Sequence, residues 1–281
     1  MSRRDSAGTV LREWRVHRRF SQMDLALLAD VSAKHLSYVE TGRSRPSPEM
    51  ILHLCEHLEV PLRDRNAILL AAGHAPRYQH SLYEAADSSE VRQVVDMVLS
   101  AHRYPAVVVD SRWNLVSANT AASMFLDDVA SDLLVAPINV IRLSLHPTGL
   151  APRVANFAEY AGHVLARLRR LVTHDPDPVL VELLAEFAHL DVGPAPASDG
   201  VVLPLELRVG DDIARMFSTI TTFGTPREVT LSELAIETFY PADDHTAELL
   251  GTADVQSRRE TSTGLTGHLT RSQHLLPISS Q

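Results

Sequence analysis

The sequence predicts two domains: an all-α N-terminal domain of five short helices and an α+β C-terminal domain built on a five-stranded antiparallel sheet. The chain has 281 residues, whereas single domains usually hold ~100–200. Apolar residues recur at helical spacing through the first 73 residues, and β-branched, strand-like runs begin near residue 105. We therefore expect one domain over 8–73, a linker over 74–90, a second domain over 91–250 and a disordered tail over 251–281.

Three short segments open the chain, each with apolar residues spaced for one face of a helix. These residues are Val10, Leu11 and Trp14, then Leu25, Leu28 and Ala29, then Leu36 and Val39. A fourth helix is expected from Pro48, with Ser47 as its N-cap, and Pro61 marks its end. A fifth is expected over Leu62–Ala72, where Gly73 stops it.

The second domain is predicted to begin with a helix over Val91–His102. Five runs have the composition of strands: 105–110, Trp113–Ala118, Val201–Val209, Ala214–Phe223 and Leu234–Tyr240. Asn119 is expected to cap a short helix that runs through Leu126, and residues 137–191 are mostly helical in pattern. Alternation in the fourth run is typical of an antiparallel strand with two different faces.

Charge is unevenly distributed along the chain. The net charge is −9, which by itself argues against a nucleic-acid partner. Residues 1–48, however, hold nine Lys/Arg and five Asp/Glu and so carry +4, while residues 76–281 hold 15 Arg and 26 Asp/Glu and carry −11. A basic N-terminal domain on an acidic body suggests a nucleic-acid reader with a second function attached, although charged surfaces are more often only solvated.

Composition excludes several protein classes. Cys55 is the only cysteine, so the chain forms neither an internal disulfide nor a cysteine-rich zinc site. The N-terminus lacks the apolar stretch of a secretory signal, and no run approaches the ~18 apolar residues of a membrane span. We therefore expect a cytoplasmic protein that uses no membrane, metal or cofactor.

Some residue groups look like metal or catalytic sites but have simpler interpretations. His53 and His57 are four residues apart and share a helical face, yet Cys55 points elsewhere and no third ligand lies nearby. Two carboxylate pairs fall at helix ends or in turns, where capping explains them: Asp127 with Asp128, and Asp175 with Asp177. GxGxxG, Walker A, GxSxG and HExxH motifs are missing from the sequence, so an enzyme is not expected.

Residues 21–45 are the most informative stretch. Ala26 falls where the two helices of a helix-turn-helix cross closely and only a small side chain fits. A turn follows, with Ser32 as the cap of the second helix, and Leu36 and Val39 then pack inward. The outer face of such a helix enters the major groove and reads base edges. Four residues fall on this face: Ala33, Lys34, Ser37 and Tyr38.

Five short stretches match a known family: Ser21-Gln22, Leu25-Ala26, Val31-Ser32, Glu40-x-Gly42-Arg43 and Pro46-Ser47. Through them the chain resembles the XRE (lambda-Cro-like) helix-turn-helix regulators, whose DNA-binding domain is a five-helix, lambda-repressor-like fold. The resemblance implies that Gln22 binds phosphate and that Arg15 forms a structural ion pair with Glu40. Asp30 replaces the common turn glycine, which is tolerable because Asp visits the left-handed region more readily than most residues.

Further stretches extend the resemblance to about residues 8–250. They read ETGRSRPSPEM, VPLRDRNAILLAAGHAP, YPAVVVDSRWNLVSAN and ETFYPAD. These look like regulators that carry an MmyB-like ligand-binding domain behind the DNA-binding domain. That resemblance implies a PAS-like fold for the C-terminal domain and a fatty-acid-like ligand.

We expect nine residues to contact operator DNA: Gln22, Ser32, Ala33, Lys34, His35, Ser37, Tyr38, Arg43 and Arg45. Lys34 is the only lysine of the chain, while His35 can also pack sideways. Arg43 and Arg45 follow the recognition helix in a loop, where a phosphate contact is favoured over simple solvation. A single helix-turn-helix covers one half-site, so a homodimer on a near-palindromic operator is expected.

The C-terminal domain leaves more than one interpretation open. An apolar sheet face is usually core, but a PAS-like sheet covered by helices can enclose a cavity for an apolar ligand. Candidate lining residues are Val107, Val109, Met216, Ser218, Ile220 and Thr222. Arg142 or Arg153 could meet a ligand carboxylate, and nothing in the sequence chooses between them. The alternatives are a ligand-independent repressor, whose second domain only dimerises or binds protein, and an enzyme tethered to DNA, for which we find no sign.

Overall fold

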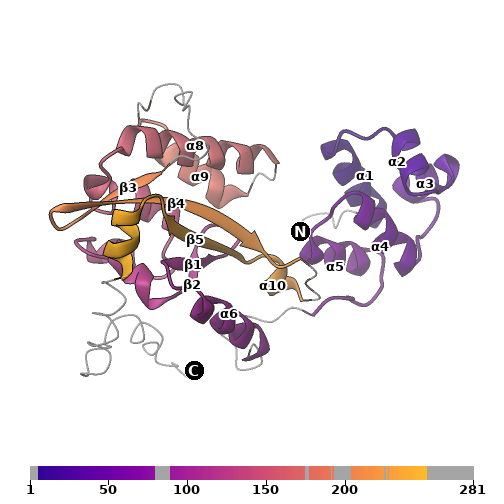
Figure 1. The fold of residues 1–281 in the computed structure, drawn as a ribbon. Helices are drawn as coiled ribbons and strands as arrows, with labels where there is room; N and C mark the ends of the chain where they lie inside the picture. Colours follow the sequence, from indigo (N-terminus) through magenta and orange to yellow (C-terminus); the bar gives the residue numbers. More distant parts are fainter. Residues whose placement is uncertain are drawn as a thin grey trace, which may run out of the picture. The chain divides into compact units, whose positions relative to one another are not determined.

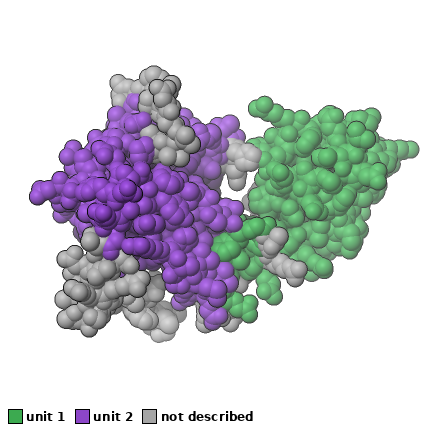
Figure 2. All heavy atoms as spheres, in the orientation of Figure 1, with its two compact units in different colours: residues 1–91, 223–233 green, residues 92–222, 234–281 purple. Residues whose placement is uncertain are grey.

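The computed structural model describes residues 6–79, 89–174, 177–190, 192, 204–224, 226 and 228–251. Two compact units divide the chain: Met1–Val91 with Phe223–Glu233, and Arg92–Thr222 with Leu234–Gln281 (Figure 2). The described part of the first is all-α apart from one bridge, and that of the second is α+β, so the predicted fold class is confirmed. The tail expected after residue 251 lies outside the described residues.

The N-terminal part of the first unit contains five helices, which Figure 1 shows as a bundle: α1 Ala7–His17, α2 Gln22–Leu28, α3 Ala33–Glu40, α4 Pro48–His57 and α5 Leu62–Ala71. Helix α4 begins as predicted, because the Ser47 hydroxyl accepts a hydrogen bond from the Met50 N–H and Pro48 stands in the first turn. Gly73 takes a φ of 75° just beyond α5. The fully buried core includes Leu11, Leu25, Leu36, Ile51, Leu54, Leu58, Ile68 and Leu69.

Small or permissive residues let the first three helices approach closely. Ala26 is 3% exposed on α2, the helix that contacts α3. Asp30 takes a φ of 50° in the turn between them, the left-handed conformation predicted for it. A Cβ added at Gly8 of α1 would collide with the Val39 carbonyl at the end of α3. The arrangement of α1, α2 and α3 therefore depends on these three positions.

The first unit continues beyond the fifth helix. The Asn66 side chain accepts from the Arg77 and Tyr78 N–H groups and donates to the Tyr78 carbonyl. Residues 74–79, where the sequence predicts the start of a linker, are therefore bonded to α5, and the linker residues 80–88 lie outside the described part.

A segment from far along the chain also belongs to this unit. Helix α10, Val229–Ser232, contacts α5. The Arg63 Nε and Nη2 atoms donate to the two carboxylate oxygens of Glu233 at 2.7 and 2.8 Å. Gln79 pairs with Glu228 in a parallel bridge. No pattern in the sequence predicts this return of residues 223–233 to the N-terminal unit.

The second unit is built on a five-stranded antiparallel sheet with the order β2-β1-β5-β4-β3. Its strands are β1 Ala106–Val109, β2 Leu115–Ala118, β3 Leu205–Val209, β4 Asp212–Thr222 and β5 Ala235–Pro241. Each overlaps a predicted run. The third begins at Leu205 rather than at Val201, and residues 201–203 lie outside the described part.

Helices cover both sides of this sheet, with α8 and α9 on one side and α6 on the other (Figure 1). They are α6 Ser89–Ala101, α7 Val140–Leu145, α8 Phe157–His174 and α9 Pro178–Glu186, with 3-10 helices η2 Thr120–Phe125, η3 Ser131–Leu134 and η4 Ala151–Arg153. Asn119 caps η2 by accepting from the Ala122 N–H, so the helix predicted there is present as a 3-10 helix. All four residues of β1 are buried, as expected for a strand covered on both faces.

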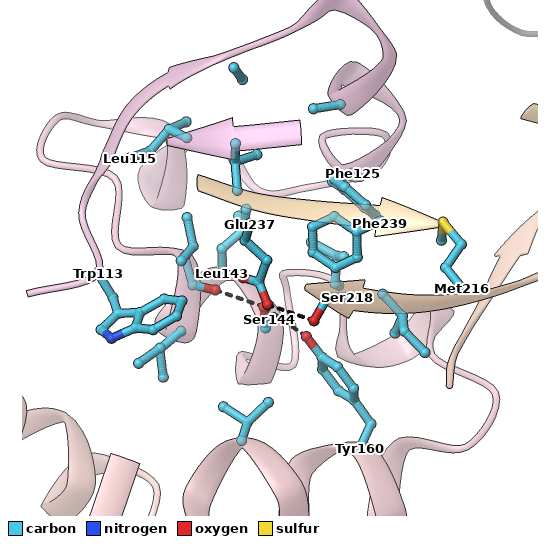
Figure 3. A pocket seen from close by; sticks show the side chains of 18 of the residues that line it. Trp113, Leu115, Phe125, Leu143, Ser144, Tyr160, Met216, Ser218, Glu237 and Phe239 are labelled. Carbon is cyan, nitrogen blue, oxygen red and sulfur yellow. Dashed lines mark hydrogen bonds between the residues drawn. The ribbon is translucent and has the colours of Figure 1, made fainter. Parts of the chain in front are cut away.

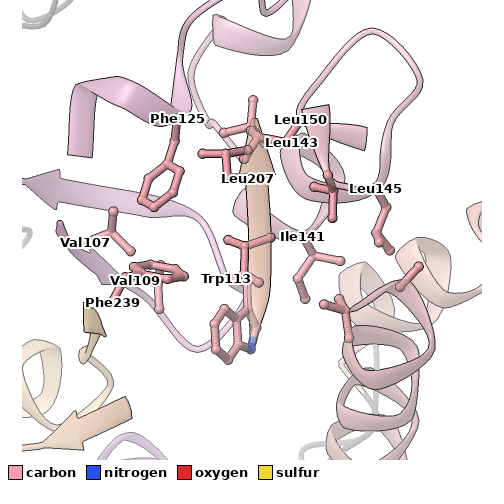
Figure 4. Close-up of a cluster of buried hydrophobic side chains, with 14 of the residues drawn as sticks. Val107, Val109, Trp113, Phe125, Ile141, Leu143, Leu145, Leu150, Leu207 and Phe239 are labelled. Carbon is pink, nitrogen blue, oxygen red and sulfur yellow. The ribbon is translucent and has the colours of Figure 1, made fainter. Parts of the chain in front are cut away.

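The main core of this unit lies between the sheet and helices α7, α8 and α9. Figure 4 shows part of it: Val107, Val109, Trp113, Phe125, Ile141, Leu143, Leu145, Leu150, Leu207 and Phe239. Side chains do not fill the whole of this space, because a cavity opens beside the same residues.

Candidate functional site

Helix α3 presents a polar face on the surface of the first unit. Leu36 and Val39 are each 1% exposed, whereas Lys34 and Tyr38, one turn apart, are exposed. The Lys34 Nζ and the Arg43 Cζ both lie 5.9 Å from the centre of the Tyr38 ring. Two cations thus lie close to one aromatic ring on this exposed face.

The other residues predicted on or beside this helix differ in accessibility. Ser32 is exposed, and Ala33, His35 and Ser37 are half-buried. Ser32 occupies the N-cap position of α3, but its hydroxyl makes no capping bond. The predicted N-cap position of Ser32 is therefore confirmed, whereas a cap bond from its side chain is not formed.

A buried network joins the first three helices. The Arg15 Nε and Nη2 atoms donate to the two oxygens of Glu40 at 2.6 and 2.9 Å, and Nη1 donates to the Phe20 carbonyl at 2.7 Å. The Gln22 Nε2 donates to Glu40 Oε2 at 2.7 Å. The hydrogen-bonded Glu40 raises the pKa of Arg15, although burial acts in the opposite direction. Gln22, predicted to hold phosphate, is thus also bonded to the Arg15–Glu40 pair.

Arg45, predicted to contact phosphate, has hydrogen-bond partners within the N-terminal unit. Its Nε donates to the Ala72 carbonyl at 2.7 Å and its Nη2 to the Gly73 carbonyl at 3.0 Å. These are carbonyls at the C-terminal end of α5, which have no partner within the helix. The guanidinium therefore stabilises the helix end, and the DNA contact expected from the loop position of Arg45 stays a prediction.

The histidines and the cysteine of α4 form no metal site. The His53 Nε2 is 2.7 Å from the Ala29 carbonyl, and its ring packs edge-on against His57 with centroids 4.8 Å apart. Cys55 is fully buried, and burial raises the pKa of its thiol to about 12. Among the described residues, no group of three or more His, Cys, Asp or Glu is arranged to hold a metal ion.

The second unit contains a cavity of about 340 Å³, at the lower end of the range for small-molecule sites. The wall comes from all five strands, from η2 and from helices α7 and α8. Most of it is apolar, including Trp113, Leu115, Phe125, Leu143, Met216 and Phe239 (Figure 3). His163, Ser123 and Ser218 line the cavity and are also exposed, which marks where it meets solvent.

A polar cluster lies within this apolar wall. Figure 3 shows the Glu237 carboxylate together with the hydroxyl groups of Ser144, Tyr160 and Ser218. Glu237, 8% exposed, accepts at Oε1 from the Ser218 hydroxyl at 2.9 Å and from the Arg167 Nη1 at 3.2 Å. The Tyr160 hydroxyl is 3.5 Å from Ser144 Oγ. The cavity therefore has a long apolar wall and one polar region.

The environment fixes the charge states around this cluster. Burial, reinforced by the nearby Glu237, raises the pKa of Tyr160 to about 12. Desolvation and the neighbouring Arg167 and Arg170 lower the pKa of His163. The Arg167 Cζ lies 3.7 Å from the centre of the Trp113 ring, so this guanidinium is held between an indole and a carboxylate.

Of the six lining residues predicted from the sequence, three line the cavity and three do not. Val107, Met216 and Ser218 line it. Val109 is fully buried in the core and does not line the cavity. Ile220 is 45% exposed and Thr222 is exposed, because β4 continues past the cavity. Assigning these last three residues to the cavity is therefore corrected by the structure.

The arginines considered for a ligand carboxylate both have other partners. Arg142 forms an ion pair with Glu186, and Arg153 donates to the carbonyls of Met124, Asp127 and Arg208. Neither lines the cavity. The cavity arginine is Arg167, which the sequence analysis did not select.

Glu237 and Tyr160 were also missed by sequence reasoning. Glu237 lies on the same face of β5 as Ala235 and Phe239. An acidic residue at a position where the alternation predicts an apolar one could have identified it from the sequence. Tyr160 and Arg167 lie seven residues apart on the same face of α8, where nothing in the sequence distinguishes them from ordinary helix residues.

Asp177 and Asp128, two of the four carboxylates that the sequence explains by capping or turns, behave in that way, whereas Asp127 lies 4.0 Å from the Arg153 guanidinium. Asp177 caps α9 by accepting from the Val179 N–H and also accepts from the Arg112 Nε at 2.9 Å. Asp128 takes a φ of 59° in a turn. Asp175 lies outside the described residues.

Comparisons with known proteins cover both units. Residues 91–252 match the family described as MmyB-like transcription regulator ligand binding domain, and residues 6–68 match a helix-turn-helix domain family. The transcriptional regulator ClgR of Mycobacterium tuberculosis, found in two strains, is 33% identical over 82 residues, which are 29% of this chain and 70% of that protein. Within the described part of the chain, no helix combines the length and apolar character needed to span a bilayer.

Proposed function

This chain belongs to the MmyB-like transcription regulators and carries a helix-turn-helix ahead of the ligand-binding domain, and we propose that a small apolar ligand in its cavity controls its binding to operator DNA. That the chain is a DNA-binding regulator follows from its family. The ligand, the dimer and the individual contacts below are the proposal. Membership of a regulator family also favours a non-enzymatic role. A protein that binds operator DNA is expected in the cytoplasm.

For DNA binding, we propose that α3 enters the major groove with Lys34 and Tyr38 foremost. The supporting observation is their exposure on the face opposite the buried Leu36 and Val39. Arg43 beside the Tyr38 ring supplies a second cation for phosphate. Residues predicted to add contacts at the edge of this face are Gln22, Ser32, Ala33, His35 and Ser37.

We propose that two copies of the chain bind one operator. One recognition helix covers one half-site, and two-fold protein symmetry is matched by a near-palindromic sequence with half-sites about 34–36 Å apart. Such pairing also raises specificity, because both half-sites must be correct. The acidic body, with −11 over residues 76–281 against +4 over residues 1–48, favours approach to DNA through the N-terminal unit.

The cavity carries the ligand part of the proposal. Its mainly apolar wall with a few convergent polar groups is the usual composition of a small-molecule site. A small apolar molecule with a fatty-acid-like chain fits this lining. The alternative, a second domain that only dimerises or binds protein, would be favoured by a solid interior, and a cavity of about 340 Å³ argues against it.

The DNA contacts are tested with a duplex selected from a random library by the full-length protein. Lys34→Ala should weaken binding and reduce the dependence of log affinity on log salt by about one contact. Arg208→Ala is the control, since it removes one exposed cation from the second unit. Equal affinities and equal salt slopes for Lys34→Ala and wild type would exclude the proposed docking.

Ligand control is tested by partly filling the cavity. Ala118→Leu adds volume at a lining position, and Ala185→Leu adds the same volume at an exposed position of α9. We expect binding of long-chain apolar molecules, followed by native mass spectrometry, to be lost only in Ala118→Leu. DNA affinity should then respond to the molecule in wild type but not in this variant, because a ligand acts only through different affinities for two states. A wild-type protein that binds no such molecule would support the ligand-independent alternative.

A further inference from the structure

The polar cluster of the cavity constrains the polar end of a ligand. Glu237 lies in the middle of β5, paired with Val107 on one side and Ile220 on the other. Its position is therefore fixed by two strand neighbours. Any molecule that fills the apolar part of the cavity with a polar group at this end meets the Glu237 carboxylate.

Glu237 has one oxygen in use and one available. Oε1 accepts from the Ser218 hydroxyl and from the Arg167 Nη1. Within the described residues, Oε2 accepts no hydrogen bond from the protein. A carboxylate oxygen in so buried a place gains a bond if the ligand brings a donor.

A donor for the ligand lies beside this acceptor. The Tyr160 hydroxyl reaches only Ser144 Oγ, at 3.5 Å, which is the limit of a useful hydrogen bond. Ser144 gives its own hydrogen to the Val140 carbonyl at 2.7 Å. Tyr160 is therefore able to donate a better bond to a ligand oxygen than the one it makes to Ser144.

The charges of the cluster cancel. Arg167 and Glu237 form an ion pair, and Tyr160 and His163 are neutral at neutral pH for the reasons given above. A carboxylate ligand would have to share Arg167 with Glu237 and would lie beside a like charge in an apolar surrounding, which is unfavourable. A hydroxyl has no such conflict, because it both accepts and donates.

We propose that the cavity selects an apolar molecule that ends in a neutral hydroxyl, such as a long-chain alcohol, and discriminates against the corresponding carboxylate. The ligand oxygen accepts from the Tyr160 hydroxyl and its hydrogen is donated to Glu237 Oε2. Arg167, which lies over the Trp113 ring, donates to Glu237 Oε1 and so holds the carboxylate in place. The inference rests on the proposed function, since it names the ligand class for the same cavity.

The test compares 1-decanol with decanoate at pH 7.5, using the full-length protein and competition against a bound apolar fluorophore. In wild type, decanol should bind about tenfold or more tightly than decanoate. Glu237→Gln removes the like charge while keeping a group that bonds to Ser218, so decanoate should bind about tenfold better and the preference should shrink or reverse. Tyr160→Phe should weaken decanol and leave decanoate nearly unchanged.

Glu206→Gln is the matched control, because it makes the same change at an ion pair with Arg215 on β3 and β4, outside the cavity. It should retain the wild-type preference. Equal or tighter binding of decanoate to wild type overturns the hydroxyl assignment but leaves the proposed function intact, as does an unchanged preference in Glu237→Gln. If neither molecule displaces the fluorophore from wild type, the ligand part of the proposed function fails and the inference fails with it.

Discussion

Removing Arg15 should destabilise the N-terminal unit strongly. The Arg15→Met variant keeps much of the side-chain volume but leaves Glu40, whose side chain is 1% exposed, without its cation. Breaking a buried ion pair from one side costs about 3–5 kcal/mol, because the remaining charge is uncompensated. The bond from Gln22 to Glu40 remains, so we expect a value near the lower end of that range.

Hydrogen exchange of the full-length protein, followed by mass spectrometry, measures this cost locally. Amides of α1, α2 and α3 that exchange by opening of the unit should exchange roughly 100-fold faster in Arg15→Met, at about 1.4 kcal/mol per tenfold change. The control is Arg12→Met, which removes an exposed cation from the same helix. Adding Glu40→Gln to Arg15→Met should restore part of the protection, because the orphaned charge disappears.

Two results would contradict this reasoning. Exchange in Arg15→Met within about threefold of Arg12→Met would mean that the pair contributes little, as surface pairs do. A double variant no better protected than Arg15→Met would mean that lost packing, and not the unpaired carboxylate, causes the effect.

Three further outcomes are expected. Gly8→Ala should destabilise the N-terminal unit by about 1–3 kcal/mol, because the added Cβ overpacks against Val39, and its melting temperature should fall. Gly224→Ala is the control and should leave the melting temperature unchanged, because its added Cβ meets nothing within 4 Å. The pKa of His163 is lowered in the folded protein, so its contribution to stability is present above the ordinary pKa of about 6.5 and is lost as the pH falls below that value. The melting temperature of a His163→Gln variant should therefore fall less steeply than that of wild type as the pH is lowered below about 6.5. The Cys55 thiol, fully buried and with a pKa raised to about 12, should react with thiol reagents only as fast as its unit opens; rapid labelling of the native protein would contradict its burial.

The N-terminal unit was predictable from sequence in detail because its constraints are local. Ala26, Asp30 and the Ser47 cap each act within a few residues of their own position, so spacing alone assigns them. The partners of Arg45 could not be predicted in this way, because they are carbonyls 27 and 28 residues away. A loop arginine after a recognition helix looks the same in sequence whether it bonds phosphate or caps a distant helix.

The cavity was predictable only as a sheet face. Alternation placed Met216 and Ser218 correctly, because a strand has a period of two. The polar cluster, however, joins Arg167 to Glu237 across 70 residues, and its Tyr160 comes from another turn of α8. Pairing of this kind depends on how the helix lies over the sheet, which no local pattern encodes.

Because residues 223–233 belong to the N-terminal unit, they constrain how domains can be exchanged between related regulators. The chain crosses from one unit to the other three times, after Val91, after Thr222 and after Glu233. If a foreign N-terminal unit replaced residues before about 90, the native α10 and Glu233 would face a helix α5 that is not their own. If instead the residues after about 90 were foreign, the native N-terminal unit would lose α10 and Glu233. A productive exchange must therefore carry residues 223–233 along with the helix-turn-helix, so that Arg63 keeps its partner and α5 keeps the helix packed on it.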